Sequence, residues 1–232
     1  MRRRLLFSAS AGVLGVTVLS ACSAETPEKP KTPASSAGTE WQRVNLSFVS
    51  AYLLVRGSEV AIVDLGTPGS ESAIEQGLKA AGAGWDNVKH VILTHKHDDH
   101  AGGLAGVQPH VSATWYAGEA DVSGIRSETA LTPVKDGDEV FGLRIIGTPG
   151  HTAGHVSVFD PANGVLVAGD ALRTTDGLAG SDPQYTADGK QAAASIKKLA
   201  ALDIKQILPG HGDPLTSGAV DALKKLAASL PS

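Results

Sequence analysis

The chain has 232 residues, of which 42% are hydrophobic and only 4% aromatic, and it carries a net charge of −4. This length allows one or two domains with an aliphatic core. The weakly acidic balance excludes the basic surface on which nucleic-acid-binding proteins depend, so we expect no nucleic-acid partner. The single cysteine, Cys22, excludes an internal disulfide.

The first 21 residues have the architecture of an export signal. A basic start at 2–4 precedes an uncharged, moderately apolar stretch over 5–19, which is too short to span a membrane. The ending Leu19-Ser20-Ala21-Cys22 resembles the bacterial lipobox. That resemblance implies lipidation of Cys22 and an exported protein anchored to the outer face of the cell membrane. The arginines also resemble a twin-arginine signal, so general secretory and twin-arginine export both stay open.

A linker is predicted after the signal. Residues 22–40 contain three prolines among Ser, Thr, Ala, Lys and Glu, and such a composition cannot bury enough apolar surface to fold. The predicted organisation is therefore a lipoprotein signal peptide over 1–21, a flexible linker over 22–40 and one folded domain over 41–232.

The folded part alternates short strands with a few helices. The hydrophobic pattern predicts strands over 43–47, 51–55, 60–64, 88–93, 111–116, 143–148, 156–159, 165–168 and 206–208. Helices are predicted over 70–81, 190–202 and 217–229, with a short helix near 118–123. Two sheets with helices outside both would bury this order of elements. The predicted fold class is therefore α/β, as a four-layer αββα sandwich.

A dense cluster of metal-binding side chains follows the predicted strand 88–93. Its members are His95, His97, Asp99 and His100. Imidazole nitrogens and carboxylate oxygens are good ligands for zinc. Alternate residues of an extended chain point the same way, so His95 and His97 can share one metal ion. Asp99 and His100 follow this extended stretch, where the chain is expected to bend, and they can turn toward a second metal ion.

Three further strand ends carry a residue of the same kind. His151 stands in Thr-Pro-Gly-His-Thr, Asp170 in Ala-Gly-Asp and His211 in Pro-Gly-His-Gly, each directly after a predicted strand. Strand ends are rigid, and glycine beside the ligand lets the backbone approach closely. We expect all these side chains to meet at one edge of the sandwich.

These motifs together resemble the metallo-β-lactamase-fold superfamily, in its glyoxalase II-like and lactonase-like branch. The resemblance covers essentially all of 41–232, which it implies to be a catalytic domain. It implies His95, His97 and His151 as ligands of a first metal ion, Asp99, His100 and His211 as ligands of a second, and Asp170 as a bridging carboxylate. It also implies that Asp64 orients one of the ligand histidines from behind.

The remaining histidines and the other acid of the cluster are not expected to bind metal. Asp98 occupies a variable position of the motif and is expected to face solvent. His155 is expected to be structural rather than a ligand. His90 and His110 are expected to lie at the surface.

The resemblance implies a hydrolase with two Zn²⁺ ions, with iron or manganese as other possible metals. Zinc lowers the pKa of bound water to about 7, so a metal-bound hydroxide would attack an ester, thioester or lactone carbonyl of a small-molecule substrate. Asp170 and Asp99 are the predicted catalytic acids, the second as a proton carrier. Arg173 and Tyr185 are candidate substrate-binding residues. Tyr185 either donates a hydrogen bond to the substrate or packs its own loop.

Three alternatives stay open: a β-lactam hydrolase, a mononuclear iron persulfide dioxygenase and a non-catalytic metal-binding lipoprotein. Asp170 departs from the β-lactamases of this fold, which generally lack the bridging acid. The complete set of ligands for a second metal ion argues against a dioxygenase that binds one iron ion. Metal content and hydrolysis measured on the same sample would separate the alternatives.

Overall fold

A computed structural model describes residues 40–231 of the chain. The predicted signal peptide, Cys22 and the predicted linker up to residue 39 lie outside the described residues. The first strand begins at Glu40, one position before the predicted start of the folded domain. None of the described helices is both long and apolar enough to cross a membrane.

The first sheet has six strands in the order β1-β2-β3-β4-β5-β6. They are β1 (Glu40–Leu46), β2 (Val49–Arg56), β3 (Glu59–Val63), β4 (Val88–Leu93), β5 (Thr114–Gly118) and β6 (Leu131–Val134). The pairs β1–β2 and β2–β3 are antiparallel. From β3 to β6 the neighbours run parallel, so the carboxyl ends of these strands share one edge of the sheet.

The second sheet has five strands in the order β13-β10-β9-β8-β7. They are β7 (Glu139–Val140), β8 (Leu143–Gly147), β9 (Val156–Asp160), β10 (Val165–Gly169) and β13 (Gln206–Pro209). All neighbours are antiparallel except β10 and β13, which run parallel. A separate hairpin joins β11 (Leu172–Arg173) to β12 (Ala179–Gly180).

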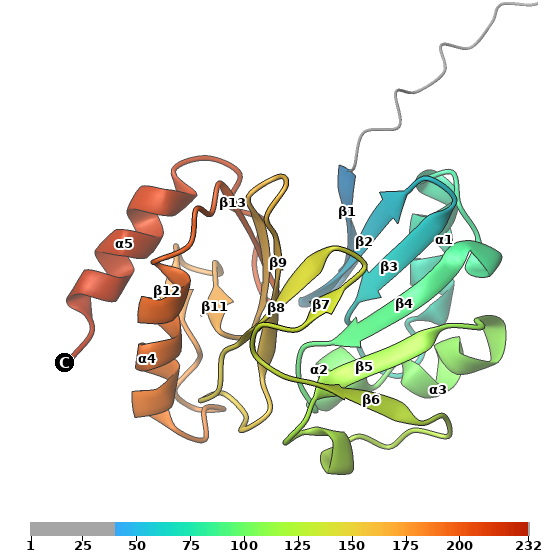
Figure 1. Cartoon of the computed structure of the whole chain (residues 1–232), viewed down its shortest axis with the longest axis horizontal. Helices are drawn as coiled ribbons and strands as arrows, with labels where there is room; N and C mark the ends of the chain where they lie inside the picture. The colour runs from blue at the N-terminus through green and yellow to red at the C-terminus, as the bar shows by residue number, and fades with distance from the viewer. Residues whose placement is uncertain (1–39, 232) are drawn as a thin grey trace, which may run out of the picture. The chain divides into compact units, whose positions relative to one another are not determined.

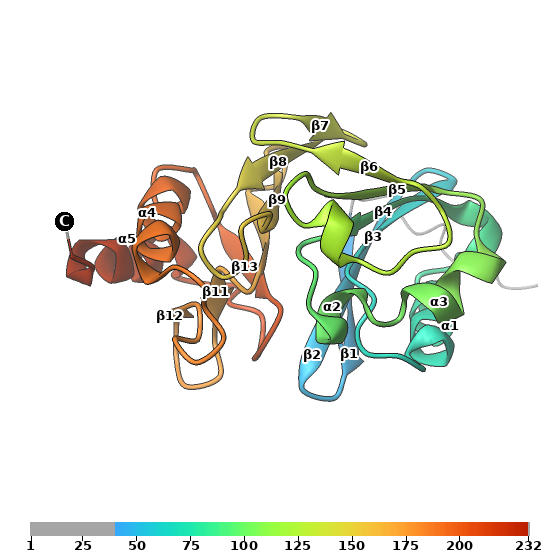
Figure 2. The ribbon, with the colours of Figure 1, turned by 90° about the horizontal axis from the view of Figure 1, so that it is seen from below.

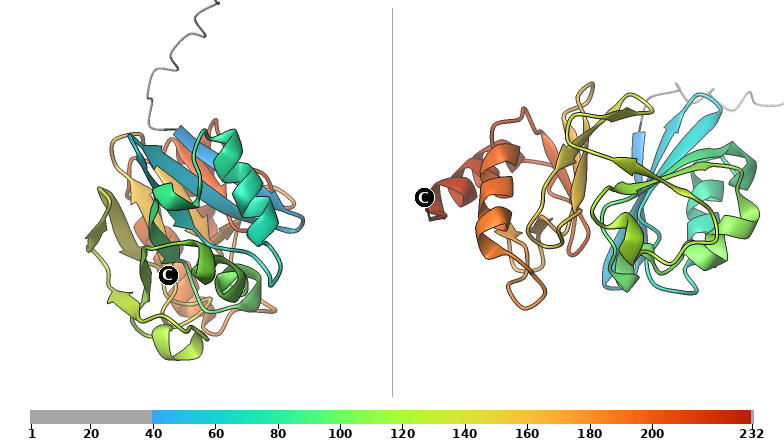
Figure 3. Two further views of the ribbon diagram at one scale, coloured as in Figure 1. Left: turned by 90° about the vertical axis from the view of Figure 1, so that its right-hand side faces the viewer. Right: turned by 60° about the horizontal axis from the view of Figure 1, so that its bottom comes forward.

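Helices cover the outer face of each sheet, as Figures 1 and 2 show. The first sheet carries α1 (Glu71–Ala80), α2 (Asp98–Ala101) and α3 (Leu104–Val107), and the second carries α4 (Gly189–Leu199) and α5 (Ala219–Ser229). Short 3₁₀ turns cover Trp85–Asn87, Gln108–His110 and Val122–Gly124. The right-hand view in Figure 3 again has the two sheets between the helices, and the predicted αββα sandwich is confirmed.

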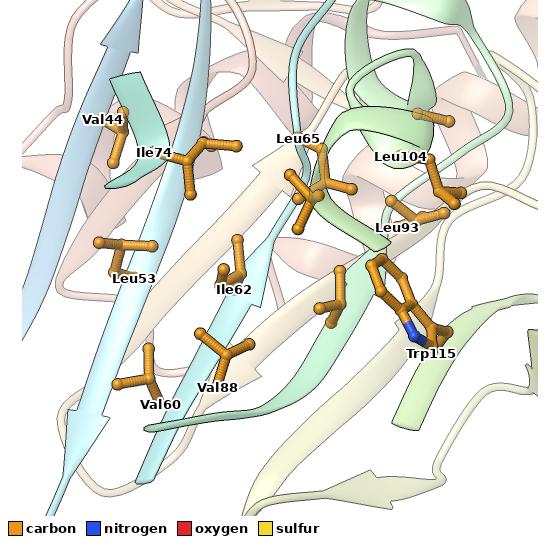
Figure 4. Packing of buried hydrophobic residues seen from close by; sticks show 14 of the residues in the cluster. Val44, Leu53, Val60, Ile62, Leu65, Ile74, Val88, Leu93, Leu104 and Trp115 are labelled. Carbon is orange, nitrogen blue, oxygen red and sulfur yellow. The ribbon is translucent and has the colours of Figure 1, made fainter. Parts of the chain in front are cut away.

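Three hydrophobic layers hold the sandwich together, because successive side chains of a strand point to opposite faces. Leu53 of β2 packs under α1 with Ile74, as Figure 4 shows. Its neighbour Leu54 faces the second sheet, where Ile145 and Val167 lie. A third layer packs α4 and α5 on the outer face of the second sheet. Strands β9 and β10 are buried along their whole length, so their ends are held rigidly.

The structure differs from the predicted elements at several boundaries. The strand predicted over 111–116 is β5, which pairs with β4 from Thr114 onward after a 3₁₀ turn. The short helix predicted near 118–123 is only the turn Val122–Gly124. The short strands β6, β7, β11 and β12 were not predicted. Strand β6 contains Pro133, and it lies at the sheet edge, where proline is tolerated.

Replacing Leu53 with alanine should lower the free energy of unfolding by about 2–5 kcal/mol, because this fully buried side chain would leave a cavity between β2 and α1. Leu226→Ala, at a partly buried position on α5, should cost less. Urea unfolding followed by circular dichroism measures both. Equal losses in the two variants would contradict this layered core.

Candidate metal centre

Four strand ends carry the predicted ligands to one place. The segment 94–97 follows β4, the segment 148–155 follows β8, Asp170 follows β10, and His211 follows β13. Backbone hydrogen bonds join these ends. The Val156 amide donates to the Thr94 carbonyl at 2.8 Å, and the Gly210 amide donates to the Gly169 carbonyl at 3.0 Å. The ligand-bearing segments of both sheets are therefore fixed to one another through their main chains.

Three histidines form the first ligand group. The Nδ1 atom of His97 lies 3.1 Å from Nε2 of His95 and 2.9 Å from Nε2 of His151. Two nitrogens bound to one tetrahedral zinc ion at 2.0–2.1 Å are about 3.3–3.4 Å apart. The three rings meet edge to face, with His95 and His151 almost completely buried. This group has the geometry of three ligands on one cation.

The second ligand group combines two histidines with two acids. The Nε2 atom of His100 lies 3.1 Å from Oδ1 of Asp170, and Nε2 of His211 lies 3.3 Å from Oδ2 of the same carboxylate. The Oδ2 atom of Asp99 lies 3.2 Å from Nε2 of His211 and 3.7 Å from that of His100. Four ligand residues therefore surround a second position.

Asp170 links the two groups. Besides its contacts with His100 and His211, its Oδ2 atom lies 3.3 Å from Nε2 of His151 in the first group. A Cβ atom added at Gly210 would lie 2.5 Å from Oδ1 of Asp170 and 2.6 Å from Cε1 of His100. Only glycine fits at this position, which explains its place before the ligand His211.

Protein groups behind the ligands fix their orientation. Nδ1 of His100 donates to Oδ2 of Asp64 at 2.8 Å, which leaves Nε2 facing the centre. Asp64 also accepts hydrogen bonds from the amide and hydroxyl of Thr94, and its backbone has φ = 62°. That conformation is costly for a residue with a side chain. Nδ1 of His211 donates to the Phe48 carbonyl at 2.8 Å, which orients the second ring in the same way.

Burial and charge shift the pKa values of these groups in opposite directions. Burial lowers the pKa of His95 well below its usual value. Burial also acts on His100, but the carboxylates of Asp170 and Asp64 outweigh it and raise the pKa of His100 well above its usual value. Hydrogen bonding to Asp170 raises the pKa of His211 to about 10. A metal ion must displace these protons, so metal binding weakens as the pH falls.

Buried polar atoms without partners test whether a metal ion fits. Among the described residues, Nε2 of His100 and Oδ1 of Asp170 are buried and form no hydrogen bond, although they lie 3.1 Å apart. Such atoms are costly unless something satisfies them. A cation held between them would satisfy both, and a set of imidazoles and carboxylates suits zinc, iron or manganese. The donor set therefore fits a pair of metal ions.

The other histidines and Asp98 lie outside the ligand groups. Asp98 is exposed at the start of α2. His155 is buried, and its Nε2 accepts a hydrogen bond from the Asp170 amide at 3.0 Å, so it supports a ligand from behind. Burial lowers the pKa of His155 to about 3. His110 is exposed and stacks on Trp85. His90 is half-buried against Tyr116 rather than fully at the surface, because it lies within β4.

A pocket of about 1160 Å³ opens over the two ligand groups. Phe48 and Tyr185 line it and are 60% and 62% exposed, so both aromatic rings lie open at its walls. Arg173 also lines it, but its Nε donates to the Gly180 carbonyl and its guanidinium lies 3.5 Å from Asp182. The guanidinium therefore holds the β11–β12 hairpin as well as facing the pocket.

Sequence reasoning missed two residues at this centre. Phe48 lies in the turn between β1 and β2, where a single aromatic gives no sign of contact with a segment 163 positions away. Asp121 is completely buried between two ligand-bearing segments, and it lies outside every motif. The only sign in the sequence was an acid that lies between Gly118 and Gly124.

Comparison with known proteins agrees with this geometry. Residues 44–130 and 133–211 match the family described as the metallo-beta-lactamase superfamily. The chain belongs to this superfamily. The matched ranges include all seven predicted ligands.

Relatives and solved structures extend the comparison. The probable metallo-hydrolase YflN of Bacillus subtilis is 29% identical over 82% of this chain and 92% of its own length. A hydroxyacylglutathione hydrolase of Acidiphilium cryptum is 34% identical over 69% of this chain and 63% of its own length. The structure of TTHA1623 in a di-iron-bound form superposes with a TM-score of 0.62 at 26% identity, over 75% of this chain and 92% of that one.

Replacing Asp170 with alanine should lower zinc binding from about two ions to about one per chain, with the second group losing its ion. The variant removes the carboxylate that contacts His100 and His211, while the three histidines of the first group remain. Equilibrium dialysis with elemental analysis measures the stoichiometry. Asp221→Ala, on the exposed side of α5, serves as the control. Unchanged occupancy after loss of Asp170 would refute its linking role.

Proposed function

We propose that this protein is an exported, membrane-anchored hydrolase with two zinc ions, which cleaves the carbonyl group of an ester, thioester or lactone. The observation that carries the proposal is the convergence of seven imidazole and carboxylate ligands at the floor of a large pocket. Membership of the superfamily and the similarity to a metallo-hydrolase and a hydroxyacylglutathione hydrolase support hydrolysis.

The chemistry divides between the metal ions and the side chains. Two zinc ions would supply a hydroxide nucleophile at neutral pH and polarise the carbonyl group. His100 and His211 keep their Nε2 atoms directed at the centre because Asp64 and the Phe48 carbonyl hold their Nδ1 atoms. Asp99 lines the pocket with 28% of its side chain exposed, so its carboxylate is placed to carry a proton toward the leaving group.

The second ligand group favours this proposal over the one-iron dioxygenase. His100, Asp170 and His211 form a complete ligand group of their own, besides the group of His95, His97 and His151. This second group supports two ions rather than one. Iron remains the alternative metal, because the similar structure of TTHA1623 is described as di-iron-bound.

The pocket walls favour a substrate with an apolar acyl or alcohol part. Phe48 and Tyr185 offer open aromatic faces, and proline, alanine and threonine side chains line part of the remainder, beside charged residues that include Lys96 and Asp98. The guanidinium of Arg173 forms an ion pair with Asp182, so Arg173 is less available to bind a substrate carboxylate. We therefore place lactones and uncharged esters or thioesters ahead of thioesters that carry several carboxylates.

A hydrolysis panel tests the proposed function. The purified protein should turn over lactones, esters or thioesters, lose turnover when zinc is removed by a chelator and regain it when zinc is restored. His151→Ala should reduce turnover by about 100-fold or more, because it removes a first-group ligand. His110→Ala, an exposed histidine outside the centre, should leave it unchanged. Phosphoesters and β-lactams complete the panel.

Two results would contradict the proposed function. Zinc binding without turnover across the panel would favour a non-catalytic metal-binding protein. One iron per chain with oxygen uptake on a persulfide would favour the dioxygenase. Turnover of β-lactams alone would replace the substrate class but keep the hydrolase.

The membrane anchor is proposed from the N-terminal sequence alone. Cys22 follows an apolar stretch and small residues in a pattern that resembles a lipobox. Cys22→Ser should move the protein from the membrane fraction to the soluble exported fraction, and it should abolish incorporation of labelled fatty acid. Membrane association and labelling that survive the substitution would contradict the anchor.

A further inference from the structure

Asp121 lies between the two chain segments that carry the first ligand group. It follows β5 and directly precedes the turn Val122–Gly124, and its exposed fraction is 0%. On one side lies the segment 94–97 with His95 and His97. On the other lies the segment 148–155 with His151. Asp121 is fully buried and does not line the pocket, so it cannot contact a substrate there.

The carboxylate binds both segments at once. Oδ2 of Asp121 accepts a hydrogen bond from the amide of Lys96, the residue between His95 and His97, at 3.1 Å. The same oxygen accepts the hydroxyl hydrogen bond of Thr152, the residue after His151, at 2.5 Å. Oδ1 accepts the Gly154 amide at 3.0 Å. One side chain therefore spans the gap between neighbours of all three histidines.

Close backbone packing makes this contact possible. A Cβ atom added at Gly154 would lie 2.3 Å from the amide nitrogen of Asp121, and one added at Gly118 would lie 1.8 Å from the Gly154 carbonyl oxygen. Both positions require glycine, since no side chain fits there. The segment 118–121 is thus pressed directly onto the segment that carries His151.

We propose that Asp121 is a positioning residue that sets the separation between His97 and His151, and thereby the affinity of the first metal ion. The proposal rests on the proposed metal centre and adds a residue to it. Asp121 touches neither the ligands' ring nitrogens nor the pocket, so it acts through its hydrogen-bond partners Lys96, Thr152 and Gly154. Groups that orient ligands from behind commonly change metal affinity by about 10–100-fold.

The effect should be selective for the first group. His100 and His211 are held by Asp64 and by the Phe48 carbonyl, neither of which contacts Asp121. Apart from Asp121, a main-chain bond from Val156 to Thr94 joins the two first-group segments. Loss of the carboxylate therefore loosens the spacing of the first group and leaves the second group in place.

Zinc titration of Asp121→Asn tests the proposal. An asparagine keeps the volume but replaces one acceptor oxygen with a donor that faces other donors. We expect the dissociation constant of the first zinc site to rise by about 10-fold or more, with the second site unchanged. Zn²⁺ is added to the metal-free protein against a chromophoric chelator. Imidazole ¹H–¹⁵N correlation spectra then follow Nδ1 of His97, the nitrogen that faces the first group.

Asp160→Asn is the matched control. Asp160 is also 0% exposed and accepts several hydrogen bonds, but it lies at the far end of β9 from the centre. Its loss should lower the free energy of unfolding without changing either zinc affinity. Thr152→Val provides a milder variant should Asp121→Asn fail to fold, because it removes one donor to Asp121 and keeps the side-chain volume. We expect a smaller rise in the first dissociation constant, of a few-fold.

The outcomes separate this proposal from the proposed function. Wild-type zinc affinity at both sites in Asp121→Asn or, where that variant does not fold, in Thr152→Val would overturn the positioning role and leave the hydrolase proposal intact. Equal weakening of both sites would overturn it as well, because the role is specific to the first group. A wild-type protein that binds no zinc would overturn both proposals.

Discussion

One carboxylate holds the two ligand groups of this protein together. Oδ1 of Asp170 contacts His100, and Oδ2 contacts both His211 and His151. Burial alone would raise the pKa of Asp170, but the imidazoles of His100, His211 and His95 keep it well below its usual value. The rest of the centre depends on this contact, because one carboxylate lies within 3.3 Å of histidines from both groups.

The sandwich brings the ends of four strands together at one edge. Strands β4, β8, β10 and β13 belong to two sheets, yet their ends meet because a shared hydrophobic layer packs the sheets face to face. Burial on both faces of β9 and β10 removes the freedom that a surface loop would have. Rigid strand ends hold ligands more exactly than loops of similar length, and this is what a pair of metal ions requires.

Much of this could be predicted from the sequence. The ligand residues lie beside glycine and proline directly after apolar runs, so local pattern sufficed to find His95, His151 and His211 and to expect a common edge. The αββα arrangement followed from the order of strands and helices, and it is confirmed. The metal-binding role of these residues and the signal over 1–21 stay predictions.

The remainder depends on contacts between distant segments, which local pattern does not encode. Phe48 orients His211 through its carbonyl oxygen, and any residue type supplies a carbonyl. Asp121 reaches both ligand-bearing segments because Gly118 and Gly154 allow the chain to pack closely there. Strand β6 was missed because its proline reads as a break, although an edge strand accepts it.

Anomalous diffraction from crystals of the zinc-loaded protein tests the central claim most directly. We expect two anomalous peaks about 3.5–4 Å apart, with Asp170 within bonding distance of both. A single peak, or two peaks that do not share the Asp170 carboxylate, would contradict it.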